Sequence, residues 1–166
     1  MFIDESIITV RSGKGGDGAA TFRREKFVQF GGPDGGDGGN GGSIIFRANP
    51  NINTLVDFKT KKMFEAEDGV KGSAARCKGA SGKDCIIEVP VGTMIRDYET
   101  GQLLVDLDEY NEEVVLLKGG LGGRGNIHFK SSIRKAPKIA ESGKEGMELK
   151  VKLELKLLAD VALVGY

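Results

Sequence analysis

Hydrophobic and polar residues alternate along much of this chain, and a period of two predicts β-strands. The clearest case is residues 147–156, where apolar and charged side chains alternate without a break. One face of such a strand is buried and the other meets solvent. No segment keeps a 3.6-residue period with caps at both ends, so we expect little α-helix, although residues 23–30 and 54–64 are ambiguous. Six further strands are predicted at residues 7–11, 43–47, 86–91, 93–97, 103–106 and 114–117.

Glycine makes up 26 of the 166 residues, and it is spaced three residues apart within its clusters. A period of three is that of the left-handed polyproline II helix, which has no internal hydrogen bonds. An edge made of glycine lets such a helix press against another backbone and exchange N–H and C=O bonds with it. Proline, at 4 residues, is too scarce for collagen, so we predict short extended helices packed together beside the β-structure. The glycine rows that we expect to be structural are Gly32, Gly35, Gly38 and Gly41, then Gly119, Gly122 and Gly125, and the pair Gly79 and Gly82.

Lys plus Arg and Asp plus Glu both number 24, so the chain has no net charge to attract nucleic acid or membrane. The charges are nevertheless segregated. Residues 97–113 hold seven acids and no Lys or Arg, whereas 114–140 hold six Lys or Arg and no acid, and further cations lie at 70–83 and 23–26. Cationic side chains and free N–H groups on a closely approaching backbone bind phosphates, which favours RNA recognition by shape. Solvated loops that are charged for solubility are the alternative.

Little in the sequence indicates catalysis or metal binding. Two cysteines, Cys77 and Cys85, are too few for a disulfide framework, and the single histidine, His128, leaves a zinc site short of ligands. Asp34 and Asp37 lie among glycines, where we expect their carboxylates to cap turns or accept neighbouring N–H groups rather than hold a metal. The acidic start of the chain and the lack of an apolar run of membrane length predict a soluble, cytoplasmic protein.

Three segments match the dinucleotide pattern G-x-G-x-x-G, at residues 13–18, 36–41 and 120–125. None of them opens a convincing helix whose N-terminus could hold a pyrophosphate, so we interpret them as glycine rows. Residues 159–166 differ, because an apolar strand there reaches Gly165. A buried strand that feeds a glycine is how a P-loop, G-x-x-x-x-G-K-[ST], begins. We therefore expect 159–166 to be the first strand of a following nucleotide-binding domain, with Gly165 as its first phosphate-loop glycine.

Five motifs, in order along almost the whole chain, give a resemblance to a known family. They are F-R-R-E-K at 22–26, G-G-P-D-G-G-D-G-G-N-G-G at 31–42, V-P-V-G-T at 89–93, G-G-L-G-G-R-G-N at 119–126 and L-K-L-L-A-D-V at 155–161. Together they resemble the N-terminal domain of the Obg family of ribosome-associated GTPases, which would then occupy residues 1–158. The resemblance implies a mainly β Obg fold: a layer of glycine-rich left-handed polyproline II helices over a small antiparallel β-barrel.

The resemblance also implies docking on the rRNA of the large ribosomal subunit, in a GTPase that acts in large-subunit assembly and stress response. GTP and Mg²⁺ would bind the following domain, so within 1–158 we expect no cofactor, no metal and no catalytic residue, and we expect a monomer. One alternative is a protein-interaction module whose glycine face meets a stress or regulatory partner, with binding that would be insensitive to salt. Another is an autonomous nucleotide-binding enzyme, which the threefold G-x-G-x-x-G pattern disfavours. The residues matched to rRNA contact are Arg23, Arg24, Lys26, Arg76, Lys78, Lys83, Arg124, Lys130, Arg134, Lys135 and Lys138.

Overall fold

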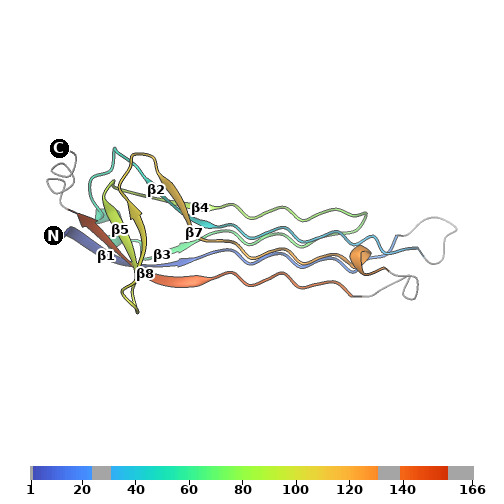
Figure 1. Cartoon of the computed structure of the whole chain (residues 1–166). Helices are drawn as coiled ribbons and strands as arrows, with labels where there is room; N and C mark the ends of the chain where they lie inside the picture. The colour runs from blue at the N-terminus through green and yellow to red at the C-terminus, as the bar shows by residue number, and fades with distance from the viewer. Residues whose placement is uncertain (1, 24–30, 131–138, 157–166) are drawn as a thin grey trace.

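The computed structural model describes residues 2–23, 31–130 and 139–156, and its strands gather at one end of an elongated molecule (Figure 1). From this strand end, extended glycine-rich segments run side by side to loop ends at the opposite pole. We call these segments the glycine layer. The layer consists of residues 12–21, 31–42, 66–74, 77–84, 118–126 and 139–147.

The strands form two sheets. Three strands make the smaller sheet, in the order β4 (Cys85–Val89), β2 (Ile44–Ala48) and β7 (Glu113–Leu117). The larger sheet has five strands, in the order β3 (Met63–Glu65), β1 (Phe2–Arg11), β8 (Glu148–Lys156), β5 (Thr93–Asp97) and β6 (Leu103–Leu107).

This β-part differs from the expected small antiparallel barrel in two ways. The two sheets do not close into a barrel among the described residues, and the pairs β1–β3 and β2–β4 are parallel, whereas the other pairs are antiparallel. Parallel neighbours need a long connection between them. The glycine layer supplies it, because the chain runs out along the layer and back between β1 and β2, and again between β3 and β4.

The mainly β class and all seven predicted strands are confirmed. The ambiguous residues 54–64 hold a short 3₁₀-helix, η1 (Val56–Lys59), followed by β3. A second 3₁₀-helix, η2 (Asn126–Phe129), lies at the far end of the glycine layer, and the described residues contain no α-helix. The ambiguous residues 24–30 and the apolar segment 159–166 with Gly165 lie outside the described residues.

The hydrophobic core lies between the two sheets. Phe46 of β2, Ile95 of β5 and Leu153 of β8 are fully buried and belong to one apolar cluster. Along β8, Val151, Leu153 and Leu155 point inward at every second position, as the alternating pattern predicts. Glu154 on the other face departs from that prediction, because it is buried and pairs with Arg96 and Lys152. Each fully buried apolar side chain of this size contributes roughly 1.5–3 kcal/mol through the hydrophobic effect. The strand end therefore holds the hydrophobic core that stabilises the described part of the chain.

The glycine layer has a different basis, because it buries backbone rather than side chains. A Cβ added at Gly35, Gly38 or Gly41 would overlap the carbonyl of a residue on segment 12–21. The N–H groups of Gly38 and Gly41 donate to the carbonyls of Gly123 and Gly120, each at 2.8 Å. Contacts therefore repeat every three residues, which is the period of polyproline II.

Gly32 is the exception in its predicted row. No atom lies within 4 Å of a Cβ added at Gly32, so the packed row begins at Gly35. The row at Gly119, Gly122 and Gly125 and the pair at Gly79 and Gly82 pack against backbone as predicted, since an added Cβ at each would overlap a neighbouring carbonyl. The physical reason is direction, because the carbonyl of Gly32 still accepts the N–H of Arg23 at 2.8 Å, whereas a Cβ on Gly32 would point into open space.

Asp and Asn side chains complete the hydrogen bonding of the layer. The carboxylate of Asp37 accepts the N–H of Gly125 at 2.9 Å, and the amide oxygen of Asn40 accepts the N–H of Gly122 at 2.9 Å. Asp34 accepts the N–H of Ala75 at 3.0 Å. The interpretation that Asp34 and Asp37 bind neighbouring N–H groups is therefore confirmed, and their spacing of three follows the period of the layer.

Candidate nucleic-acid interface

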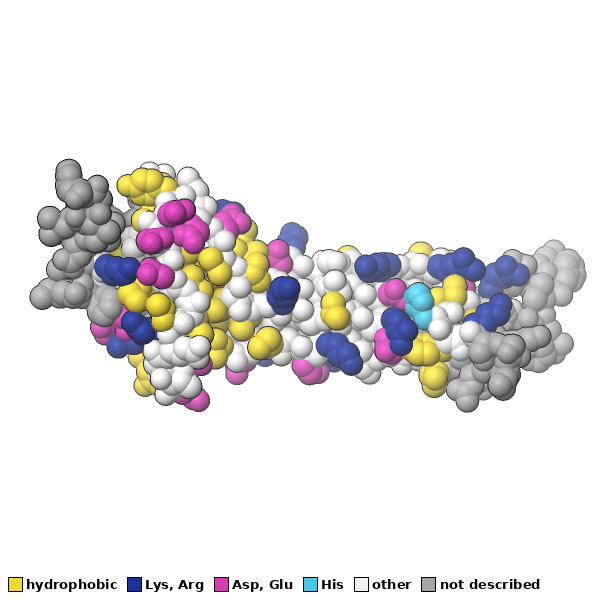
Figure 2. Space-filling model, in the orientation of Figure 1, with side chains coloured by type: hydrophobic (Ala, Val, Ile, Leu, Met, Phe, Trp, Pro, Cys, Tyr) yellow, Lys and Arg dark blue, Asp and Glu magenta, His cyan; other side chains and the backbone are white. Residues whose placement is uncertain are grey.

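Cationic side chains accompany the glycine layer toward its loop ends. Figure 2 shows Lys and Arg side chains along the outer half of the layer, on the face that it presents. The strand end carries the acidic side chains of residues 97–113 in β5, β6, β7 and their connections. The acidic segment 97–113 therefore lies at the strand end, although cations such as Lys59 and Lys152 also lie there and acids such as Asp68 and Glu145 lie along the layer.

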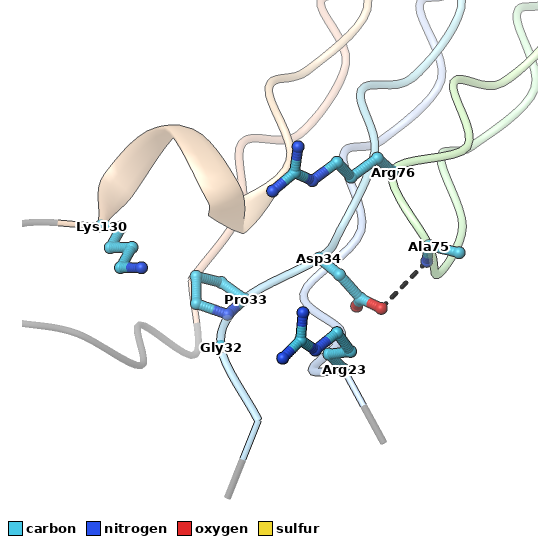
Figure 3. Close-up of a pocket in the computed structure, with 7 residues that line it drawn as sticks. All are labelled: Arg23, Gly32, Pro33, Asp34, Ala75, Arg76 and Lys130. Atoms are coloured by element: carbon cyan, nitrogen blue, oxygen red, sulfur yellow. Dashed lines mark hydrogen bonds between the residues drawn. The ribbon is translucent and has the colours of Figure 1, made fainter. Parts of the chain in front are cut away.

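A hollow of ≈ 380 Å³ lies at the loop ends, where three parts of the layer converge (Figure 3). Three cationic side chains line it, and each comes from a different segment: Arg23, Arg76 and Lys130. Among the described residues that line the hollow, Asp34 is the one acid. The remaining lining residues are Gly32, Pro33 and Ala75.

Both carboxylate oxygens of Asp34 accept hydrogen bonds from within the chain. The residue is only 8% exposed, its Oδ1 accepts the hydroxyl of Thr21 at 2.7 Å, and its Oδ2 accepts the N–H of Ala75 at 3.0 Å. Within the described part of the chain, no ion pair involves Arg76 or Lys130. The hollow therefore presents positive charge, and cations on a backbone-rich surface suit phosphate groups.

The structure brings together only some of the predicted rRNA contacts. Arg23, Arg76 and Lys130 meet at the hollow. Lys78 and Lys83 are exposed farther along segment 77–84 and do not line it. The predicted contacts Arg24, Lys26, Arg134, Lys135 and Lys138 lie outside the described residues.

Arg124 is engaged within the chain. Its Nε and Nη2 donate to the two carboxylate oxygens of Glu141 at 2.9 and 3.2 Å, and its guanidinium lies 5.0 Å from the centre of the Phe129 ring. The hydrogen bonds from Arg124 lower the pKa of Glu141 to about 2. An RNA phosphate would have to replace Glu141 to reach this guanidinium, so Arg124 is a weaker candidate for contact than Arg76 or Lys130.

The three G-x-G-x-x-G segments do not form phosphate cradles. In segment 13–18 the N–H groups of Gly13 and Gly16 donate to the carbonyls of Gly42 and Gly39, each at 2.8 Å. Every other glycine N–H of the three segments likewise donates to a carbonyl, carboxylate or amide oxygen of a neighbouring segment. A phosphate loop needs free N–H groups, so the interpretation of these segments as glycine rows agrees with the structure.

His128 and the acids do not form a metal centre. His128 Nε2 lies 2.8 Å from Asp37 Oδ1, which also accepts the N–H of Gly125. Across residues 2–23, 31–130 and 139–156, no group of three or more His, Cys, Asp and Glu side chains could hold a metal ion. The helical segments of those residues include none long and apolar enough to cross a membrane.

Asn126 is a structural residue of this end that sequence reasoning missed. It is fully buried, its amide oxygen accepts the N–H of Gly35 at 2.9 Å, and its amide nitrogen donates to the carbonyl of Thr21 at 2.8 Å. Asn126 thereby joins the segments 12–21, 31–42 and 118–126. Its spacing could have revealed it, because Asn126 follows Gly120 and Gly123 at the same interval of three residues.

The chain is a mainly β protein of a distinct architecture, a small two-sheet β-domain that carries a layer of glycine-rich extended segments. The chain belongs to the GTP1/OBG family, whose model matches residues 3–157. It is 68% identical over 166 residues to the GTPase Obg of Fusobacterium nucleatum subsp. nucleatum, which covers 100% of this chain and 39% of that protein.

Two further relatives agree. The GTPase Obg of Thermosipho africanus is 57% identical over 165 residues, covering 99% of this chain and 38% of that protein. A GTPase Obg of Clostridium botulinum is 56% identical over 166 residues, covering 100% of this chain and 39% of that protein. The chain therefore spans about two fifths of the length of the curated relatives that it matches.

Proposed function

We propose that this chain is the domain of an Obg-type GTPase that docks on the rRNA of the large ribosomal subunit. The loop ends of the glycine layer make the contact, and the whole protein acts in large-subunit assembly and in stress responses in the cytoplasm. GTP binds together with Mg²⁺ and is hydrolysed in a domain that begins near residue 159, and residues 1–158 contribute no catalytic group. Support for the GTPase activity comes from the names of the relatives, each called GTPase Obg.

The observation that carries the docking proposal is the cationic hollow at the loop ends. Arg76 and Lys130 have no ion pair among the described residues, and Asp34, the only acid among the described residues that line the hollow, is buried and hydrogen-bonded. Backbone phosphates are the groups that such an arrangement binds, and RNA is recognised largely through shape and phosphate contacts. A layer held by interlocked backbones also loses little conformational entropy when it binds.

Cosedimentation with isolated large ribosomal subunits at several salt concentrations tests this proposal. One variant carries Arg76, Lys78 and Lys83 changed to Glu, and a second carries Arg134, Lys135 and Lys138 changed to Glu. We expect both variants to bind more weakly and with a shallower dependence on salt. They make fewer phosphate contacts, so fewer counterions are released when they bind. A control with Arg11, Lys61 and Lys150 changed to Glu alters the charge equally at the strand end, where none of the three makes an ion pair among the described residues, and should bind as the wild type does.

A protein-interaction function is favoured by a surface other than the glycine face, an apolar strip on the outer face of the smaller sheet. Ile45 of β2 lies between Ile86 of β4 and Val115 of β7 in the strand register. Ile86 is 45% exposed and Val115 is 48% exposed. Binding through this strip would be insensitive to salt and would be lost when Ile86 and Val115 become Ser. The rRNA proposal is refuted if both charge-reversed variants cosediment with large subunits with unchanged affinity and salt dependence, while the variant with Ile86 and Val115 changed to Ser does not cosediment.

A further inference from the structure

The loop end that carries Arg76 is a turn with an unusual backbone. The N–H of Cys77 donates to the carbonyl of Ala74 at 3.2 Å, and both central residues are left-handed, with φ of 58° at Ala75 and 60° at Arg76. Turns with two positive φ angles favour Gly and Asn, because a Cβ comes too close to the backbone carbonyl there. Neither central residue is of that kind, so other contacts must stabilise this turn.

Asp34 supplies those contacts from the neighbouring segment. Its Oδ2 accepts the N–H of Ala75 at 3.0 Å, and its backbone carbonyl accepts the N–H of Arg76 at 2.7 Å. Its Oδ1 accepts the hydroxyl of Thr21 at 2.7 Å, which fixes the orientation of the carboxylate. One buried residue therefore binds the N–H groups of both left-handed residues, as Figure 3 shows for Ala75.

We infer that Asp34 is a positioning residue for RNA binding: it holds the left-handed turn 74–77 and so presents the Arg76 guanidinium to a backbone phosphate at the hollow. This inference rests on the proposed function. Asp34 itself points into the fold, toward Thr21 and Ala75, and is 8% exposed, so it contributes through Arg76 and not by contact with RNA. Fixing the backbone beneath a long side chain lowers the entropy that the side chain loses on binding.

Other carboxylates of the layer provide a matched comparison. Asp84 accepts the N–H of Ser43 at 2.8 Å, so it makes the same kind of side-chain to backbone bond at the strand end. It neither lines the hollow nor contacts a left-handed residue. Asp34→Ala and Asp84→Ala each remove a carboxylate that accepts a backbone N–H. Asp34→Ala also removes a buried bond to Thr21, and only this change should affect the presentation of Arg76.

The test measures binding to isolated large ribosomal subunits for the wild type, Asp34→Ala, Arg76→Ala and the double variant. We expect Asp34→Ala to weaken binding roughly tenfold, within the range of coupling between residues that touch. The same change should have almost no effect when Arg76 is already Ala. Asp34→Asn keeps an acceptor oxygen and should retain most of the affinity, and Asp84→Ala should bind as the wild type does.

Amide hydrogen exchange on the free chain provides the second readout. In Asp34→Ala we expect faster exchange at Ala75 and Arg76 only, while the strand amides keep their protection. If Asp34→Ala does not fold, Thr21→Val replaces it, since this change removes only the hydroxyl bond to Oδ1 and should weaken binding in the same direction by a smaller factor.

The outcomes separate the two proposals. If the wild type does not bind large subunits, the proposed function fails and the RNA role of Asp34 fails with it, whatever the exchange data show. If the wild type binds but Asp34→Ala binds equally well, the docking proposal survives and the positioning role is refuted. Losses from Asp34→Ala and Arg76→Ala that simply add would also refute it, because a residue that acts through Arg76 has no effect in its absence.

Discussion

Replacing Gly38 by alanine tests whether the glycine layer is packed backbone or a set of loose loops. A Cβ at Gly38 would overlap the carbonyl of Gly16 and stand 2.9 Å from the carbonyl oxygen of Asp17. Backbone cannot move aside as a flexible side chain can, so the segments 12–21 and 31–42 must separate. Two hydrogen bonds at this point are affected, from the N–H of Gly38 to Gly123 and from the N–H of Gly16 to Gly39, each 2.8 Å long.

The expected loss of stability follows from these contacts. Overpacking a well-packed site costs about 1–3 kcal/mol, and each weakened hydrogen bond costs about 0.5–1.5 kcal/mol. Alanine also lowers the conformational entropy of the unfolded chain, which stabilises the folded state by about 0.4–1 kcal/mol. The net destabilisation is therefore roughly 1–5.6 kcal/mol, and a value near 3 kcal/mol lowers the melting temperature of a domain of this size by roughly 6–12 °C.

Thermal and urea unfolding, followed by circular dichroism, measure this change. Gly32→Ala is the matched control, because it is the same substitution in the same predicted row and a Cβ there meets nothing within 4 Å. The residue before a proline favours an extended backbone, which alanine adopts without strain. Asp37→Ala would be a poor control, since that carboxylate accepts the N–H of Gly125 and bonds to His128.

We expect Gly32→Ala to be neutral or stabilised by up to about 1 kcal/mol, and Gly38→Ala to be clearly destabilised. The difference between the two variants isolates the packing contact, because the effect on the unfolded chain is common to both. A Gly38→Ala variant as stable as Gly32→Ala would refute the packed layer and would indicate that the segments around residue 38 are free in solution.

Three further predictions follow from single contacts. Asn126→Ala leaves the N–H of Gly35 and the carbonyl of Thr21 without their partner, so urea unfolding should show a loss of about 1–3 kcal/mol for each buried group left unpaired. Because Arg124 lowers the pKa of Glu141 to about 2 from 4.5, this carboxylate stabilises the fold above pH 4.5 and loses that contribution as the pH falls toward 2; its titration by carbon NMR should shift upward in Arg124→Gln. Calorimetry of residues 1–166 with GTP and Mg²⁺ should show no heat of binding, because the glycine N–H groups of the three G-x-G-x-x-G segments are all donated within the layer, and micromolar affinity would contradict this.

The candidate interface shows the limits of sequence reasoning at particular residues. Charge clustering singled out Arg76 and Lys130, which line the hollow, and it also singled out Arg124, which pairs with Glu141. Nothing local distinguishes these cations, because the ion pair joins residues 17 positions apart in sequence. The left-handed turn at Ala75 and Arg76 was equally hidden, since neither residue type is typical of that conformation.

The sequence by itself determined the period of each part of the fold. Alternation fixes which face of β8 is buried, and glycine at every third position permits backbone contact along a whole edge, because both properties depend only on residue type and spacing. The tertiary structure alone decided which segments meet: that Gly38 faces Gly16, that Gly32 faces open space, and that Asp34 reaches the turn at Ala75. Extended segments without internal hydrogen bonds have no local preference for a neighbour, so their pairing is settled only when all the segments pack together.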